Sequence, residues 1–415
     1  GNMMTYMVSY MHKNVSETIT YSNIIWVNSI TTLSQGLFMV LGGFLEARVG
    51  PRITCFIGCS ILSSGIMLTS VTIKESLPMV LLTYGLLAGL GISLSYVSPL
   101  ACGMKWFPDK KGLINGLIVA GFGLGALGST NFQTLYLNPE NKSPGPDGYF
   151  DDPAILERVP SVFISLGVIF LVMQYTGCLF LSKPAQNSET HHQQDRQRLL
   201  DEEVESVDEN VHIDVSKKEP YLNKDLRPIE MIKNGTFYCL WFIYLFNTIG
   251  IGYINAMYKS FGQTFIKNDL LLAQVGSFAA VFNCAGRIFW GKLMDKTSFR
   301  FSMRILSVCL SLLFATLSFT VHLGQIAFTA WIWAIFFTFS GTFVLMPTAA
   351  EKAFGSTHYT ANYGLFFTSQ VVSGPLIAAG NQALLHAVGY SGCFLVVALV
   401  ISLSTVLTFI VPKNL

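Results

Sequence analysis

Residues 276–296 read GSFAAVFNCAGRIFWGKLMDK, an apolar run of membrane-spanning length that contains one arginine, Arg287, before its charged end. Arg287 precedes Asp295 by eight residues, which places it roughly 12 Å deeper along a helix. A cation at that depth costs at least ~2.5 kcal/mol on insertion scales, so such residues usually face a cavity or a partner. No acid elsewhere in the apolar runs offers to neutralise it, which favours a ligand-binding role. The alternative is a structural arginine that bonds carbonyls of a neighbouring helix or reaches the membrane surface.

The composition is that of an integral membrane protein. Of the 415 residues, 51% are hydrophobic and 12% are charged, against about 25% charged residues in soluble domains. The formal net charge is +2 and no basic run is present, so we expect no nucleic-acid partner. The eight cysteines lie in apolar runs, which predicts buried thiols rather than disulfides or a metal site. We expect no cofactor and no enzymatic activity.

Eleven apolar runs are long enough to cross a bilayer. They cover residues 22–45, 53–73, 77–103, 112–137, 160–182, 237–257, 270–294, 302–321, 326–350, 361–385 and 390–411. A shorter apolar run, GNMMTYMVSYMHK, precedes these eleven and is counted below as the first. It has only about half the ~20 residues that a span needs, so we expect part of this helix to be missing from the sequence. The pattern predicts an all-α membrane protein of twelve helices, in two six-helix bundles at residues 1–182 and 234–415.

Residues 183–233, between the two halves, are rich in charged and polar side chains, which predicts a solvated, flexible linker. Within it, DRQRLL has the spacing of an acidic dileucine sorting signal, formed by Asp195, Leu199 and Leu200. Such short matches also arise by chance. If the signal is used, sorting adaptors are partners and the protein resides in an endolysosomal membrane rather than the plasma membrane.

The placement of lysine and arginine predicts the orientation in the membrane. Cations follow the second, fourth and eighth runs, on the same side as the linker, which is therefore expected to be cytoplasmic. Three glycosylation sequons test this assignment. Asn14 and Asn141 fall on the outer side, where modification is possible, whereas Asn234 falls inside and should stay unmodified.

A short motif is repeated in the two halves. The second run ends in Gly43-Phe-Leu-Glu-Ala-Arg48 and the eighth in Gly291-Lys-Leu-Met-Asp-Lys296. Six helices plus six with repeated loops are typical of a transporter whose site lies at the midplane between its halves. We expect Gly43, Arg48, Gly291, Asp295 and Lys296 to act in packing and gating at the cytoplasmic face.

The whole chain resembles the major facilitator superfamily through these two loops, although Ala47 stands where that family usually has aspartate and Glu46 is a candidate substitute. A more specific motif, YVSPLACGMKWFPDKKG at residues 96–112, precedes AGFGLG at residues 120–125. It resembles the oxalate–formate antiporter family and the monocarboxylate transporters. The resemblance implies alternating access and a small carboxylate substrate, held by cationic and aromatic groups in a central cavity.

The resemblance also assigns the carboxylate contact to Arg287, whose planar guanidinium meets a carboxylate through two parallel bonds. Oxalate carriers also use a lysine on the eleventh helix, but no cation lies in residues 361–380, where Gln370 is the strongest polar group. A single cation favours one carboxylate over two. Proton-coupled monocarboxylate carriers place an aspartate four residues before the arginine, where this chain has Asn283, so we expect no proton carrier within the membrane.

Four further residues are candidate substrate contacts. Tyr6 and Tyr10 share one face of the first helix, where the resemblance favours substrate contact, although tyrosine is also common at membrane interfaces. Gln35 is the positional counterpart of Asn283, and hydrogen bonding between helices explains it equally well. Tyr253 follows Gly250-Ile-Gly252, a break that serves either as a hinge or as a packing notch.

We therefore predict a monomeric carrier in the lipid bilayer, moving small organic anions of the monocarboxylate or oxalate kind by alternating access. One alternative is a carrier of amino acids or other zwitterions, with Arg287 holding their carboxylate. Another is a membrane sensor or scaffold that transports nothing. Exchange of carboxylates across a vesicle membrane separates these three interpretations.

Overall fold

The computed structural model describes residues 2–140, 142, 145, 148–184, 225–267, 269–412 and 415, and within them it contains helices and no strand. Nine helical spans in these residues are long and apolar enough to cross a membrane. The sequon at Asn141 and the candidate sorting residues Asp195, Leu199 and Leu200 lie outside the described residues, as does most of the expected linker. Those predictions therefore stay untested.

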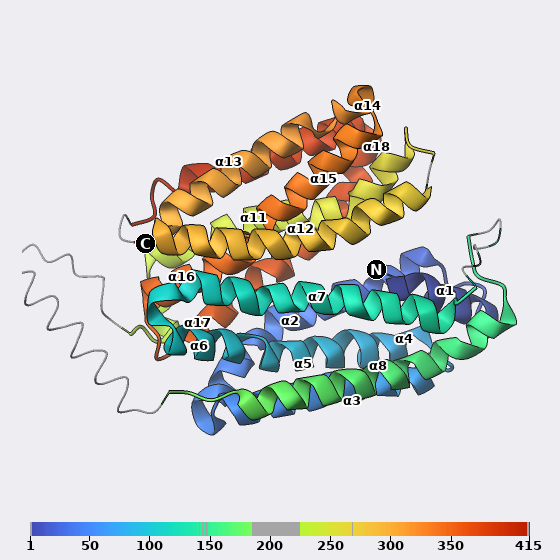
Figure 1. Ribbon diagram of the computed structural model, residues 1–415, viewed down its shortest axis with the longest axis horizontal. Coiled ribbons are helices and arrows are strands. Elements are labelled where there is room, and N and C mark those ends of the chain that lie inside the picture. The colour runs from blue at the N-terminus through green and yellow to red at the C-terminus, as the bar shows by residue number, and fades with distance from the viewer. Residues whose placement is uncertain are drawn as a thin grey trace, which may run out of the picture.

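The N-terminal half forms one bundle (Figure 1). Its elements are α1 (Asn2–Asn14), α2 (Tyr21–Val49), α3 (Pro51–Thr72), α4 (Leu77–Val80), η1 (Leu81–Leu87), α5 (Ala88–Ser95), α6 (Val97–Trp106), η2 (Pro108–Lys110), α7 (Lys111–Leu137) and α8 (Pro153–Phe180). The four pieces α4, η1, α5 and α6 together make one span, Leu77–Trp106. Together with α1, α2, α3, α7 and α8, this span gives the N-terminal half six long helices.

The C-terminal half forms the second bundle. Its elements are α10 (Pro228–Met231), α11 (Gly235–Gln263), α12 (Asp269–Lys296), α13 (Phe299–Leu317), α14 (Thr320–Leu323), α15 (Gln325–Phe339), α16 (Thr342–Phe354), α17 (Tyr359–Phe366) and α18 (Thr368–Leu407). The helices α15 and α16 together form one span, Gln325–Phe354. Gly389, at φ +65°, divides α18 in two, so this half also has six long helices. The all-helical two-bundle architecture expected from the sequence is confirmed.

The two bundles lie side by side and approach each other at the end where the described ends of the linker lie, beside α16, α17 and the start of α7 (Figure 1). We call this end the linker side. The tip of α1, the end of α7 and the start of α8 lie at the opposite end. A large apolar core fills the C-terminal bundle and continues into the N-terminal one through Met39, Val97 and Met104. Contacts between the bundles are therefore concentrated on the linker side.

Asn234 begins α11 as its N-cap, and its side-chain Oδ1 accepts a hydrogen bond from the Thr236 backbone N–H at 2.9 Å. Such caps satisfy a donor that the first helical turn leaves unpaired. We expect Asn234→Ala to reduce the free energy of unfolding by about 1 kcal/mol, and Asn234→Asp to retain most of it, since aspartate caps equally well. Thermal unfolding in detergent measures the difference. Equal midpoints for the parent and Asn234→Ala would contradict this role.

Candidate functional site

The first of two seams between the bundles joins α7 to α12. Gly112 and Gly291 face each other so closely that a Cβ built on Gly291 would lie 2.2 Å from the Gly112 carbonyl oxygen. The carboxylate of Asp295 accepts hydrogen bonds from the backbone N–H groups of Gly112 and Leu113, both at 2.7 Å. These donors begin α7, so the carboxylate also complements the positive end of that helix. Asp295 and Gly291 thus hold the two bundles together.

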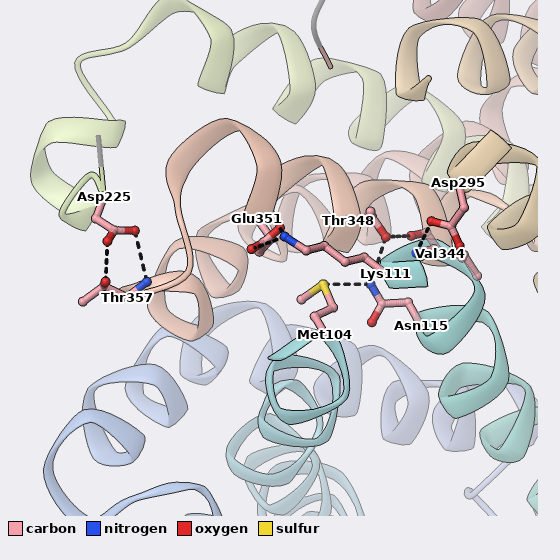
Figure 2. Close-up of polar contacts among 10 residues, drawn as sticks. Met104, Lys111, Asn115, Asp225, Asp295, Val344, Thr348, Glu351 and Thr357 are labelled. Carbon is pink, nitrogen blue, oxygen red and sulfur yellow. Dashed lines mark hydrogen bonds and ion pairs between the residues drawn. The ribbon is translucent and has the colours of Figure 1, made fainter. Parts of the chain in front are cut away.

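Two further polar contacts join α7 to α16 on the linker side (Figure 2). Lys111 Nζ pairs with Glu351 at 2.7 and 2.6 Å, and both side chains are largely buried. Asn115 Nδ2 donates to Thr348 Oγ1 at 2.9 Å, where both residues are fully buried. Buried contacts of this kind are costly to leave half made, so they resist partial separation of the bundles.

The second seam joins α2 to α17. A Cβ on Gly43 would lie 2.2 Å from the backbone nitrogen of Ala361, and one on Gly364 would lie 2.9 Å from the Met39 carbonyl. Glu46 Oε2 accepts from Thr360 Oγ1 at 2.6 Å, at the start of α17. Glu46, in the copy of the repeated motif that has Ala47, therefore contacts the C-terminal bundle. Asp295, in the other copy, contacts the N-terminal bundle in the same way.

Arg287 lies in the first seam. The residue is 8% exposed, its Nη1 donates to the Val119 carbonyl of α7, and its carbon Cζ lies 5.8 Å from the centre of the Phe343 ring. A Cβ on Gly116 would lie 2.5 Å from the Arg287 carbonyl. The backbones of α7 and α12 therefore touch at Gly116, one helical turn closer to the linker side than Val119. Within the described residues, Arg287 forms no ion pair and its Nε has no hydrogen-bond partner. The buried guanidinium of Arg287 thus has no hydrogen-bond partner at its Nε.

An aromatic group lies beside this arginine, and sequence reasoning missed it. It comprises Tyr96, Tyr244, Phe343, Tyr363 and Phe367. The ring of Phe367 is 5.8 Å from Tyr96, 5.9 Å from Tyr244 and 5.4 Å from Tyr363, measured between ring centres. Tyr244 also meets Phe343, at 6.4 Å. The group therefore gathers side chains from both bundles, with Phe343 linking it to Arg287.

Two predicted polar residues lie near these groups. Gln370 Nε2 donates to the Tyr244 hydroxyl at 3.3 Å, which attaches it to the aromatic group. Asn283 donates to the Phe336 carbonyl at 3.4 Å, and its Oδ1 lies 3.9 Å from a Cβ built on Gly123. The same Cβ would lie 3.7 Å from Arg287 Nη1, so Asn283 and Arg287 face the same part of α7.

The other candidate contacts lie elsewhere in the fold. Tyr6 stacks on Phe150 at 4.9 Å, and Tyr10 lines a cavity of about 690 Å³ between α1, α3 and α8. Tyr253 packs against Phe394 at 5.9 Å inside the C-terminal bundle. Gln35 is half-buried in α2. Among the described contacts, none joins these four residues to Arg287, and their role in substrate binding stays a prediction.

The remaining predicted residues lie at the surface. Arg48 and Lys296 are exposed at the linker-side ends of α2 and α12, so their part in gating also stays a prediction. Asn14 is exposed at the end of α1, away from the linker side, where its Nδ2 donates to the Tyr10 carbonyl at 3.1 Å. Of the gating residues, the structure thus brings Gly43, Gly291 and Asp295 into contact with the other bundle.

A membrane protein of two helical bundles with a buried cation between them has the form of a transporter. The chain belongs to the Major Facilitator Superfamily, whose family model matches residues 1–379. It is similar to the transporter FucP in its outward conformation, with a TM-score of 0.70 at 10% identity over 99% of this chain and 97% of that one. The fold is therefore the twelve-helix fold of these multi-pass transporters.

Among relatives, the chain is 29% identical to apicoplast pyruvate carrier 1 of Toxoplasma gondii, over 95% of this chain and 75% of the relative. It is 24% identical to the oxalate:formate antiporter of Oxalobacter formigenes, over 90% of this chain and 78% of that protein. Both names describe carriers of small carboxylates. The resemblance inferred from residues 96–125 is therefore confirmed.

Proposed function

We propose that this protein carries small organic anions with one carboxylate across its membrane by alternating access, with Arg287 as the carboxylate contact and the linker side as the cytoplasmic side. The observation that carries this proposal is the buried guanidinium, which has no acidic partner within the described residues and an unpaired Nε. An unpaired buried charge is costly, and an anionic substrate relieves that cost.

The guanidinium is suited to two contacts at once. Its Nη1 is occupied by the Val119 carbonyl of α7, which leaves the edge formed by Nε and Nη2 for a carboxylate. Binding through that edge gives two parallel charge-assisted bonds. Because the same guanidinium also bonds α7, substrate binding acts directly on the seam between the bundles.

The aromatic group favours a small substrate. Phe343 offers an apolar face next to Arg287, and Phe367 lies beside Tyr244 in the same aromatic group, where the Tyr244 hydroxyl and Gln370 provide polar groups. A small 2-oxo or 2-hydroxy acid has this combination of one carboxylate, one polar oxygen and a short apolar tail. The absence of a cation in α17 and in the described side chains of the first half of α18 disfavours a second carboxylate.

The conformation supports alternating access. The described contacts between α7 and α12 begin on the linker side, at Gly112 and Gly291, and reach Gly123, where a Cβ would lie 2.9 Å from Cys284 Sγ. The bundles are thus closed on the linker side. Transport requires them to rock about the level of Arg287 and open these seams.

Exchange in proteoliposomes tests the proposal. Vesicles loaded with pyruvate, lactate, formate, oxalate or an amino acid are given either a labelled monocarboxylate or a labelled amino acid outside, and uptake of the label is followed. We expect monocarboxylates to drive uptake, and oxalate and amino acids to drive it weakly. Uptake driven by amino acids alone would favour the zwitterion carrier, and no exchange with any substrate would favour a scaffold or sensor.

A further inference from the structure

The described residues at the first end of the linker are attached to the linker-side contacts. After α8, the carbonyl of Ser182 accepts a hydrogen bond from Trp106 Nε1 at 2.7 Å. The next residue, Lys183, lies 3.8 Å from Glu46, measured from Nζ to Oε1. The other oxygen of Glu46 accepts from Thr360 at the start of α17. The chain that leaves the N-terminal bundle is therefore linked, through Glu46, to the C-terminal bundle.

The described residues at the second end bind the loop between α16 and α17. Asp225 Oδ2 accepts from Thr357 Oγ1 at 2.5 Å, and its Oδ1 accepts from the Thr357 backbone N–H at 3.2 Å (Figure 2). The backbone of Leu226 donates to the Phe354 carbonyl at 3.0 Å and accepts from Asn362 Nδ2 at 2.8 Å. Four hydrogen bonds thus fix two residues of the linker, two of them to this loop and two to the helices on either side of it.

The loop is shaped to receive Asp225. Gly355 has φ +85°, and a Cβ there would lie 1.9 Å from Asp225 Oδ1, so the carboxylate occupies the space that a side chain would need. Partial burial opposes ionisation of Asp225, but the hydrogen bonds from Thr357 outweigh it and lower the pKa of this carboxyl group. Met231, a few residues on, is fully buried. Asp225 is therefore a charged carboxylate that packs against this loop and is hydrogen-bonded to it.

Both attachments lie next to contacts that close the linker side. The loop that holds Asp225 follows Glu351, the partner of Lys111, and precedes Ala361, the neighbour of Gly43. Thr357, which binds Asp225, and Thr360, which binds the Glu46 that pairs with Lys183, are three residues apart around the start of α17. The two ends of the linker therefore converge on the segment of α17 that meets α2.

We propose that Lys183 and Asp225, which we call the linker-end clamp, hold the start of α17 against α2 and so set how readily the carrier opens on its linker side. The proposal rests on the alternating-access mechanism above, but not on the identity of the substrate. Opening on the linker side must separate α17 from α2. Neither attachment crosses between the bundles itself: Lys183 orders Glu46 on the α2 side of this contact, and Asp225 orders Thr357 on the α17 side. Loss of either attachment is therefore expected to weaken the contact between Glu46 and Thr360 and to raise the fraction of molecules that are open there.

Cys284 reports this opening, because it is buried in the first seam with its Sγ donating to the Ala120 carbonyl at 3.2 Å. A membrane-impermeant maleimide is applied to the linker side of sealed vesicles without substrate, and its attachment to Cys284 is followed by peptide mass spectrometry. We expect Asp225→Ala to label about three to ten times faster than the parent, the range expected when one or two hydrogen bonds are lost. Lys183→Ala should label up to about five times faster, because Lys183 is partly exposed and its ion pair with Glu46 spans 3.8 Å.

Matched variants separate the clamp from general loosening. Lys233→Ala, an exposed change near the same end of the linker, should label like the parent. Thr357→Val should label faster and Thr357→Ser, which keeps the hydroxyl group, should not, and this pair decides the matter if Asp225→Ala folds poorly. Parent-like labelling in both Asp225→Ala and Lys183→Ala, or equal acceleration in Lys233→Ala, would overturn the proposal. Because no substrate is present, failure of carboxylate exchange leaves this result interpretable.

Discussion

Arg287→Lys is expected to reduce carboxylate exchange by about 10- to 100-fold although the positive charge is kept, because hydrogen bonds to charged groups contribute roughly 1.5–3 kcal/mol and each 1.4 kcal/mol is tenfold. In the parent, Nη1 bonds the Val119 carbonyl while Nε is unpaired. A lysine ammonium is a point donor on a flexible stem and cannot hold α7 and present a planar edge to a carboxylate at the same time. Arg287→Ala should abolish measurable exchange.

The control is Arg304→Lys in α13. Arg304 also makes defined contacts, with its Cζ 3.8 Å from the centre of the Phe409 ring and its Nε donating to Thr408 Oγ1 at 3.3 Å, but these partners belong to its own bundle. Exchange by this variant should match the parent. Initial rates over a range of substrate concentrations measure both changes. If Arg287→Lys exchanged carboxylates like the parent, the proposed carboxylate contact would be wrong.

Most of the fold could be predicted from the sequence, because each span must bury about 20 apolar residues and pair its own backbone groups. The ends of the helices were harder to predict. The run expected at residues 160–182 belongs to Pro153–Phe180, which begins earlier because Asp152 caps it outside the apolar stretch. The π-helical turn Leu81–Leu87 was not expected either. Hydropathy locates the membrane-spanning segments, whereas capping and packing decide where each helix begins and bends.

The candidate site could be predicted only in part. Arg287 was found because a lone cation in an apolar run is conspicuous, and the two repeated glycines because the motif recurs. The aromatic group was missed because 13% of the chain is aromatic, so only tertiary contacts distinguish Phe343 or Phe367 from their many equivalents. Tyr96 opens the motif that carried the family resemblance, but it was not expected to lie at the site. Nothing in the helix of Tyr6 predicts that Phe150 folds back upon it, and the role of Tyr6 in substrate contact stays a prediction.

Gly291→Ala is expected to lower exchange by about tenfold or more, because it destabilises the state in which the linker side is closed. The new Cβ would lie 2.2 Å from the Gly112 carbonyl oxygen and 2.7 Å from its carbon, and neither backbone atom can rotate away. The bundles must separate by roughly 1 Å to restore an ordinary contact. That separation breaks the 2.7 Å bonds from Gly112 and Leu113 to Asp295, and bonds to a carboxylate contribute roughly 1.5–3 kcal/mol each.

The loss should concern gating rather than folding. Alanine is the better helix former, by roughly 1 kcal/mol, and the broken bonds join the two bundles rather than residues within one bundle, so both bundles should still fold in Gly291→Ala, with a lowered thermal midpoint. Gly177→Ala, where a Cβ on α8 meets no atom within 4 Å, is the matched control and should exchange like the parent. Labelling of Cys284 from the linker side should accelerate in Gly291→Ala and stay slow in Gly177→Ala. Parent-like labelling and exchange in Gly291→Ala would mean that the two glycines pack the bundles without limiting their movement.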